Sequence, residues 1–421
     1  MRVFKKKLLE KTEELIKLLD FERLAGTGGE EKARLILIKC LEKLSVELTT
    51  ETFEFIGFNE NQGVIEISDR KFPCVPFGLT DSINIVGELV FVENPTALKF
   101  SNKNYKGKII LSYGSLPLIQ QYLLKNEAAG FISIGPPFTK TMSMTNKQHQ
   151  YKTGVVPAVT IDHEIGLALL SFENTPLKIR IKQKPAPKKG VNIIADIPGI
   201  ISDNSLTYLV GHYDSVAHSN GSNDNAGGVI SILKTLEFFS NNKPQRNLRV
   251  IFFSSEESGL LGSFEYVKKH QAEIEERAQL VINIDGAGDA LGLNKYYVIG
   301  TQSLLGYIDG VSKELGLVFQ KNLDIFSSDC IPFAQLGIPS VSIEKCLGKG
   351  AFHYHTSDDT ALNTSARGLA APIKAATGLL SRILNSEVYP IERKIDHSLK
   401  NKIESAVYKY TGEKKPLLWS L

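Results

Sequence analysis

The sequence predicts an α/β fold, in which a sheet is covered by helices on both faces, joined to a separate β-rich module. After Gly190, apolar runs of strand length alternate with amphipathic helical stretches. From about Glu51 to Lys184, short strand-like runs follow one another and turn residues separate them. A chain of 421 residues normally forms more than one domain, which agrees with the different patterns of these two regions.

The N-terminal region is predicted to be helical. Leucine and isoleucine recur at helical spacing in residues 5–18, and a glycine-rich turn precedes a second helix from about Glu30 to Leu44. We expect residues 1–50 to belong, with residues 188–390, to the α/β module.

The β-rich module is predicted to span residues 51–187. Short helices interrupt it, for example around Leu116–Leu124. Gln183–Gly190 contains prolines and lysines and is predicted to be the exit linker. The strand-like runs are TFEFIG, GVIEIS, GELVFV, GKIILSYG, AAGFISIG and VPAVTID.

The α/β module contains nearly continuous apolar runs, as expected of strands that are buried on both faces of a parallel sheet. Apolar residues at positions 229, 232, 233, 236 and 239 form one face of an intervening helix. Residues 391–421 are a C-terminal extension to which the pattern assigns no role. The runs are VNIIADI, LTYLVG, LRVIFFS, LVINID, KYYVIG and SVSIE.

The composition argues against several classes of protein. The net charge is only +3 and no basic block stands out, so nucleic-acid binding is not expected. No apolar run is long enough to cross a membrane, and the charged N-terminus lacks the pattern of a signal peptide. The four cysteines are scattered without a C-x-x-C pair, so we expect a reducing cytoplasm and no thiolate zinc site.

Polar residues follow the apolar runs where each predicted strand ends. In open α/β sheets the loops beyond the carboxyl ends of strands converge, so these side chains are expected to meet. One pair, Glu256–Glu257, places two like charges side by side directly after a strand. The candidates are His212, Asp214, Asp224, Glu256, Glu257, Asp285, His353, His355, Asp358 and Asp359.

Imidazole and carboxylate without thiolate suit zinc, with cobalt or manganese as substitutes. Each feature has a structural alternative: a carboxylate pair before a helix favours the helix dipole, and His-Thr-Ser-Asp can cap a helix. Their coincidence at neighbouring strand ends favours two divalent ions with one bridging carboxylate. Such ions would let Glu256 and Glu257 coexist, one as a ligand and one as a base. The remaining histidines, at positions 149, 163, 218, 270 and 397, are expected to be structural or on the surface.

The motifs GHYDSV, SNDNAGGV, FFSSEESGLLGS, INIDGAG and YHTSDDT, in this order, resemble the co-catalytic dizinc aminopeptidase family. That family also contains glutamate carboxypeptidase II, the transferrin receptor and the glutaminyl cyclases. The resemblance covers roughly Phe21–Asn385, and the β-rich insert is similar to a protease-associated (PA) domain. It implies a zinc-exopeptidase fold, a three-layer α/β/α mixed sheet with an inserted PA domain.

The resemblance also implies the metal ligands. His212 and Asp285 would hold one zinc, Glu257 and His355 the other, and Asp224 would bridge them. The family's His-Thr-x-x-Asp pattern selects His355 with Asp359 rather than His353, which the residues alone leave open. The peptide bond from Asp224 to Asn225 is expected to be cis.

The other implied roles concern the reaction. Glu256 would be the general base, Asp214 would orient the imidazole of His212, and Tyr354 would stabilise the oxyanion. Cys330 departs from the family, whose members commonly have histidine there. The implied substrate is a peptide with a free N-terminus.

Three other functions remain as alternatives. A carboxypeptidase acting on dipeptides or C-terminal glutamate would need an arginine cluster near the motifs, and none is present. A glutaminyl cyclase uses one metal and normally lacks the insert. A binding protein of the transferrin-receptor type would have lost ligands. A covalent acyl-enzyme is disfavoured because the serines lack a G-x-S-x-G elbow.

Overall fold

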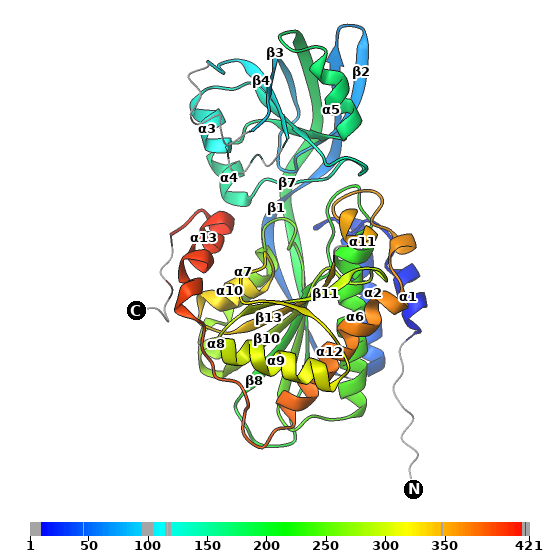
Figure 1. Ribbon diagram of the computed structural model, residues 1–421, viewed down its shortest axis with the longest axis vertical. Helices are drawn as coiled ribbons and strands as arrows, with labels where there is room; N and C mark the ends of the chain where they lie inside the picture. Colours follow the sequence, from blue (N-terminus) through cyan, green and yellow to red (C-terminus); the bar gives the residue numbers. More distant parts are fainter. Residues whose placement is uncertain are drawn as a thin grey trace.

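Two long strands connect the two parts of the protein, β1 (Glu47–Ile67) and β7 (Pro176–Ile197). They pair antiparallel along almost their whole length, from Glu47 opposite Asp196 to Ile67 opposite Leu177. Figure 1 shows them rising from the lower, α/β part into the upper part. The computed structural model describes residues 10–44, 46–94, 104–113, 116, 119–346, 348–414 and 417.

The sheet of the α/β part has the order β1-β7-β9-β8-β10-β13-β11-β12. Strands β9, β8, β10 and β13 run parallel, so four of the six apolar runs pair as expected. The runs in β7 and β11 pair antiparallel with β9 and β13, so the parallel arrangement that their apolar character indicated was wrong for these two. The sheet is mixed, as the family resemblance implied. The further bounds are β8 (Leu206–His212), β9 (Asn247–Phe253), β10 (Ala278–Ile284), β11 (Leu293–Ile299), β12 (Gln320–Asn322) and β13 (Ser340–Cys346).

Chain connections explain both reversals. Residues 285–292 between β10 and β11 are too few for a crossover, which takes a dozen residues or more, so β11 returns in the opposite direction. Strand β7 descends from the upper part as the antiparallel partner of β1.

Helices cover both faces of this sheet and complete an α/β/α arrangement (Figure 1). Neighbouring side chains along a strand pack against helices on opposite faces of the sheet: Leu209 packs on one face, and Tyr208 and Val210 pack on the other. One layer contains α1 (Thr12–Leu18), α2 (Gly28–Leu44), α6 (Gly227–Asn241), α9 (Gln302–Glu314) and α12 (Ala366–Leu384). The other contains α7 (Leu261–Lys269), α8 (Gln271–Arg277), α10 (Cys330–Gln335) and α13 (Lys400–Thr411).

The upper part, here called the barrel module, is a closed ring of strands. Its order is β1-β2-β6-β5-β4-β3-β7, and the pairing of β7 with β1 closes it. TFEFIG and GVIEIS, expected as separate runs, belong to the single strand β1. The module comprises β2 (Arg70–Pro76), β3 (Ile83–Val92), β4 (Lys108–Tyr113), β5 (Gly130–Ile134), β6 (Ala158–Ile161), α3 (Gln120–Lys125), α4 (Gln148–Thr153) and α5 (His163–Leu170).

Residues Gln183–Gly190 are strand rather than the expected irregular linker, so that expectation was wrong. Between the two modules, β7 pairs only with β1 among the described strands, and its other edge has no partner in them there. Pro185 and Pro187 are compatible with such an edge, where a missing N–H costs no ladder hydrogen bond. The predicted boundaries at residues 50/51 and 187/188 therefore fall inside two continuous strands.

Helix α13 gives the C-terminal extension a defined place. Its buried residues Ile403, Val407 and Tyr410 pack in the layer that contains α10. Within the described residues, no helix is long and apolar enough to cross a membrane.

Replacement of Ile403 by alanine should test whether α13 is an integral part of the fold. The side chain is fully buried, so its truncation should lower the free energy of unfolding by about 2–4 kcal/mol. Chemical denaturation measures this, with the exposed Asn401→Ala in the same helix as the control. An unchanged stability of Ile403→Ala would mean that α13 does not pack as described.

Candidate metal centre and catalytic site

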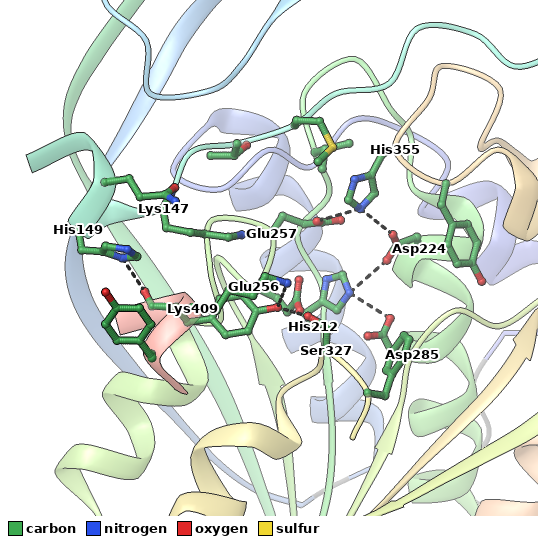
Figure 2. Close-up of a pocket in the computed structure, with 18 of the residues that line it drawn as sticks. Lys147, His149, His212, Asp224, Glu256, Glu257, Asp285, Ser327, His355 and Lys409 are labelled. Atoms are coloured by element: carbon green, nitrogen blue, oxygen red, sulfur yellow. Dashed lines mark hydrogen bonds and ion pairs between the residues drawn. The ribbon is translucent and has the colours of Figure 1, made fainter. Parts of the chain in front are cut away.

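The carboxyl ends of β8, β9 and β10 bring the predicted site residues together, as expected for neighbouring parallel strands. Two further residues come from a turn before α6 and from the loop after α11 (Lys349–Phe352). Figure 2 shows the side chains turned toward one another. They are His212 at the end of β8, Glu256 and Glu257 after β9, Asp285 after β10, Asp224 before α6 and His355 after α11.

The carboxylate of Asp224 lies between two histidines, with one oxygen facing each. Its Oδ1 lies 3.3 Å from Nε2 of His212, which is also 3.3 Å from Oδ1 of Asp285. Its Oδ2 lies 3.3 Å from Nε2 of His355, which is 3.1 Å from Oε2 of Glu257. The five side chains thus form two groups of three donors that share Asp224.

These separations fit bound metal better than hydrogen bonding. Each Nε2 faces two carboxylate oxygens but can donate only one proton, and charge-assisted hydrogen bonds are usually about 2.7–2.9 Å long. Donor atoms around a tetrahedral zinc, each about 2.0–2.1 Å from the ion, lie about 3.3 Å apart. The observed distances of 3.1–3.3 Å match that spacing. The donors are therefore of the right type and spacing for zinc.

The charges in the pocket lead to the same conclusion. Burial raises the pKa of Glu256, Glu257 and Asp285, and the nearby imidazoles offset this only in part. Burial alone would lower the pKa of His212 and His355, but the surrounding carboxylates outweigh it and raise both values. Crowded carboxylates of this kind need positive charge, which divalent cations would supply.

Asp214 fixes the turn that presents the glutamate pair. Its two carboxylate oxygens accept hydrogen bonds from the backbone N–H groups of Glu256 and Glu257, at 3.1 and 3.3 Å. Its Oδ1 is also 3.5 Å from Nδ1 of His212, on the opposite side of the ring from Asp224. The predicted contact with the imidazole is thus loose, while the contacts with the glutamate turn are direct.

The turn that carries Asp224 is held from both sides. Asp359 accepts hydrogen bonds from the backbone N–H groups of Asn223 and Asp224, at 2.7 and 3.1 Å. The side chain of Asn225 donates to the carbonyl of Ile284 at the end of β10 and accepts from Gly228 N–H. The peptide bond from Asp224 to Asn225 is cis, as the resemblance implied.

The structure distinguishes the two histidines of the late motif. His355 points its Nε2 at Asp224 and Glu257, whereas His353 is buried apart from them with Nδ1 3.9 Å from Asp358. Asp359 joins the His355 loop to the Asp224 turn. His355, not His353, is therefore placed to bind metal.

A cavity of about 1060 Å³ opens onto this centre. Glu256 and Tyr354 both line it. Among the described residues, no basic group lies within 4.0 Å of the Glu256 carboxylate, in contrast to Glu257. The buried hydroxyl of Tyr354 has no hydrogen-bond partner in the part of the chain that the structure describes, and burial raises its pKa well above 10, so it remains a donor.

Sequence reasoning missed the wall of the cavity opposite the metal centre. Lys147 and His149 reach it from α4 and the residue before it, and Lys409 and Tyr410 from α13. His149 was expected to be structural or on the surface. It does form a structural contact, with Nδ1 3.2 Å from the carbonyl oxygen of Tyr410, but it also lines the cavity. No local motif could have indicated this wall, because its two segments are more than 250 positions apart in the chain. The buried thiol of Cys330 lies in the apolar layer with α10 and α13.

Arg23 was also missed, and it supports the loop between His212 and Asp224. The fully buried guanidinium donates to five backbone carbonyls, including those of Tyr213, Asn220 and Gly221. Five donors in a fixed plane suit this task, which lysine could not perform. The N-terminal segment therefore holds the loop that leads to Asp224.

Replacement of Arg23 by methionine should lower the free energy of unfolding by about 3–5 kcal/mol, because several buried carbonyls would lose their donor. Denaturant titration measures the loss, and Arg34→Met, at a partly exposed arginine of α2, is the control. A loss below about 1 kcal/mol would show that Arg23 does not fix this loop.

Comparison with known proteins finds a match to a family model over part of the chain, and a shared fold. Residues 192–378 match the model of peptidase family M28, and this match contains all of the candidate ligands. The chain is similar to aminopeptidase YwaD of Bacillus subtilis, with 27% identity over 388 residues that cover 87% of this chain and 82% of the relative. It is also similar to human carboxypeptidase Q, with 24% identity over 373 residues that cover 80% and 77% of the two chains.

Among solved structures, the aminopeptidase from Aneurinibacillus sp. strain AM-1 superposes with a TM-score of 0.72 at 23% identity. The superposition covers 93% of this chain and 97% of that one. The α/β/α fold with a mixed sheet is therefore shared, and the similarity extends over nearly the whole chain.

Proposed function

We propose that this protein, a member of peptidase family M28 through residues 192–378, is a zinc-dependent aminopeptidase that removes N-terminal residues from peptides. The observation that carries the proposal is the Asp224 carboxylate, which presents one oxygen to the His212 and Asp285 group and the other to the His355 and Glu257 group. The similarity to aminopeptidase YwaD supports peptide substrates. Zinc is supported by a further similar structure, BSAP, described as a zinc aminopeptidase from Bacillus subtilis, with a TM-score of 0.74 at 20% identity. Two ions, one per group, are our inference from the geometry, with cobalt or manganese as possible substitutes.

When bound, zinc ions in such a site activate a water as the nucleophile and polarise the scissile carbonyl. Glu256 lines the cavity without a basic partner and is placed to accept the proton from that water at its carboxylate. It would then deliver the proton to the nitrogen of the leaving amine. The Tyr354 hydroxyl would donate a hydrogen bond to the developing oxyanion.

The acidic lining also suits a free α-amine. Glu256, Asp285 and Glu344 all border the cavity, so an N-terminal ammonium group would meet negative charge there. Location in the cytoplasm is part of the proposal, and it is supported by the buried free thiols of Cys40, Cys74 and Cys330. Assignment of the barrel module to the PA class remains a prediction.

A tripeptide assay tests the direction of cleavage. With Leu-Gly-Phe and added zinc, we expect leucine to be released first and N-acetyl-Leu-Gly-Phe to resist hydrolysis, because the acetyl group removes the ammonium charge. Chromatography of the early products measures both. Initial release of phenylalanine, or equal hydrolysis of the blocked peptide, would instead support the carboxypeptidase alternative suggested by the carboxypeptidase Q relative.

The glutamate pair provides a second test. Glu256→Gln should retain most of the bound zinc and lose activity by a factor of about 10²–10⁴, because only the proton acceptor is removed. Glu257→Gln should lose zinc itself, because it removes a ligand. Metal analysis after dialysis, together with kcat, separates the two roles. If both variants lose zinc equally, the assignment of base and ligand is wrong.

A further inference from the structure

The cavity has opposite charge at its two walls. The metal-side wall carries Asp224, Glu256, Glu257 and Asp285, whereas the facing wall carries the ammonium groups of Lys147 and Lys409. Figure 2 shows the Lys147 side chain extending from the α4 side toward the glutamate pair. A ligand in the cavity therefore meets a negative end and a positive end.

Neither ammonium group is neutralised by the protein. Among the described residues, no carboxylate lies within 4.0 Å of either Nζ. Both groups instead flank the ring of Tyr410, with Lys147 Nζ 5.2 Å and Lys409 Nζ 5.0 Å from its centre. Lys409 Nζ also donates a long hydrogen bond, 3.5 Å, to the Tyr410 hydroxyl. A ring face attracts a cation but does not accept the ammonium protons as a carboxylate does, so the N–H groups of Lys147 and the remaining ones of Lys409 are available to a ligand.

The protein fixes Lys147 more firmly than Lys409. The aliphatic part of the Lys147 side chain packs against the backbone of Gly259. A Cβ atom at position 259 would lie 3.0 Å from Cδ of Lys147, so the contact is close. Gly259 has a φ of +115° and follows the glutamate pair by two residues, so the ammonium is held beside the catalytic turn. Lys147 is half-buried and Lys409 is exposed, so water screens the charge of Lys409 more strongly.

The segment before Lys147 is attached to the metal centre itself. Ser143 N–H donates to the carbonyl of His355 at 2.7 Å, and its hydroxyl donates to the carbonyl of Ala217. Gly78 N–H donates to the carbonyl of Met144 at 2.7 Å, which links the segment to the rest of the barrel module. The position of Lys147 is therefore set together with that of a metal ligand.

We propose that Lys147, assisted by Lys409, forms a subsite for a carboxylate on the part of the peptide beyond the scissile bond. The inference rests on the proposed function, in which the acidic wall holds the α-amine at the other end of the substrate. The carboxylate can come from the C-terminus of a short peptide or from an aspartate or glutamate side chain. Charge-assisted hydrogen bonds to the ammonium would hold it.

Matched peptides test the subsite and distinguish the two sources. Leu-Gly and Leu-Gly-NH₂ differ only in the C-terminal carboxylate, and Leu-Glu-NH₂ and Leu-Gln-NH₂ differ only in a side-chain carboxylate. In at least one pair, we expect the full-length zinc enzyme to hydrolyse the peptide that carries the carboxylate with a kcat/KM roughly tenfold or more above that of its amide partner. The difference should lie chiefly in a lower KM. Lys147→Met should reduce that ratio to near one, and Lys147→Arg should restore most of it.

The control is Lys152→Met, which removes an exposed lysine of helix α4, the helix that begins directly after Lys147. Lys152 does not line the cavity, so this variant should retain the wild-type ratio. Calorimetric binding of the same peptides to the Glu256→Gln protein gives the preference without turnover. Thermal unfolding of each variant verifies that it is folded.

Each outcome decides a separate claim. Equal kcat/KM for acid and amide in both pairs, or a ratio that Lys147→Met leaves unchanged, overturns the subsite while the peptidase function stands. If no peptide is hydrolysed, the proposed function fails, and the binding preference in the Glu256→Gln protein still decides the subsite.

Discussion

The structure depends on the cluster of buried carboxylates around Asp224. Buried acidic groups at this spacing repel one another, and the two imidazoles offset only part of their charge. A pair of divalent cations would turn the same arrangement into a stable one. The fold holds the Nε2 atom of each histidine at 3.1–3.3 Å from two carboxylate oxygens, so little rearrangement would be needed when metal binds.

Hydrogen bonds to the backbone hold the segments that carry these donors. Asp214 fixes the glutamate turn, Asp359 fixes the Asp224 turn, and Arg23 fixes the loop between His212 and Asp224. These three charged side chains direct their hydrogen bonds mainly at peptide groups. The site is therefore supported by rigid main-chain geometry, as a preorganised catalytic centre requires.

The sequence indicated most of the α/β part and the candidate ligands, because apolar runs and the polar residues at their ends are local signals. It did not indicate the direction of β7 and β11, which depends on connection length and on pairing with a distant strand. Prolines made residues 183–190 look like a linker, although a two-stranded arm accommodates them. The wall formed by Lys147 and Tyr410 joins segments far apart in the chain, and no local pattern predicts such a contact.

Anomalous diffraction at the zinc absorption edge, from crystals grown with zinc, tests the central claim most directly. The account predicts two peaks, one between His212 and Asp285 and one between His355 and Glu257, on either side of the Asp224 carboxylate. A single peak, or two peaks that do not share Asp224, would contradict it.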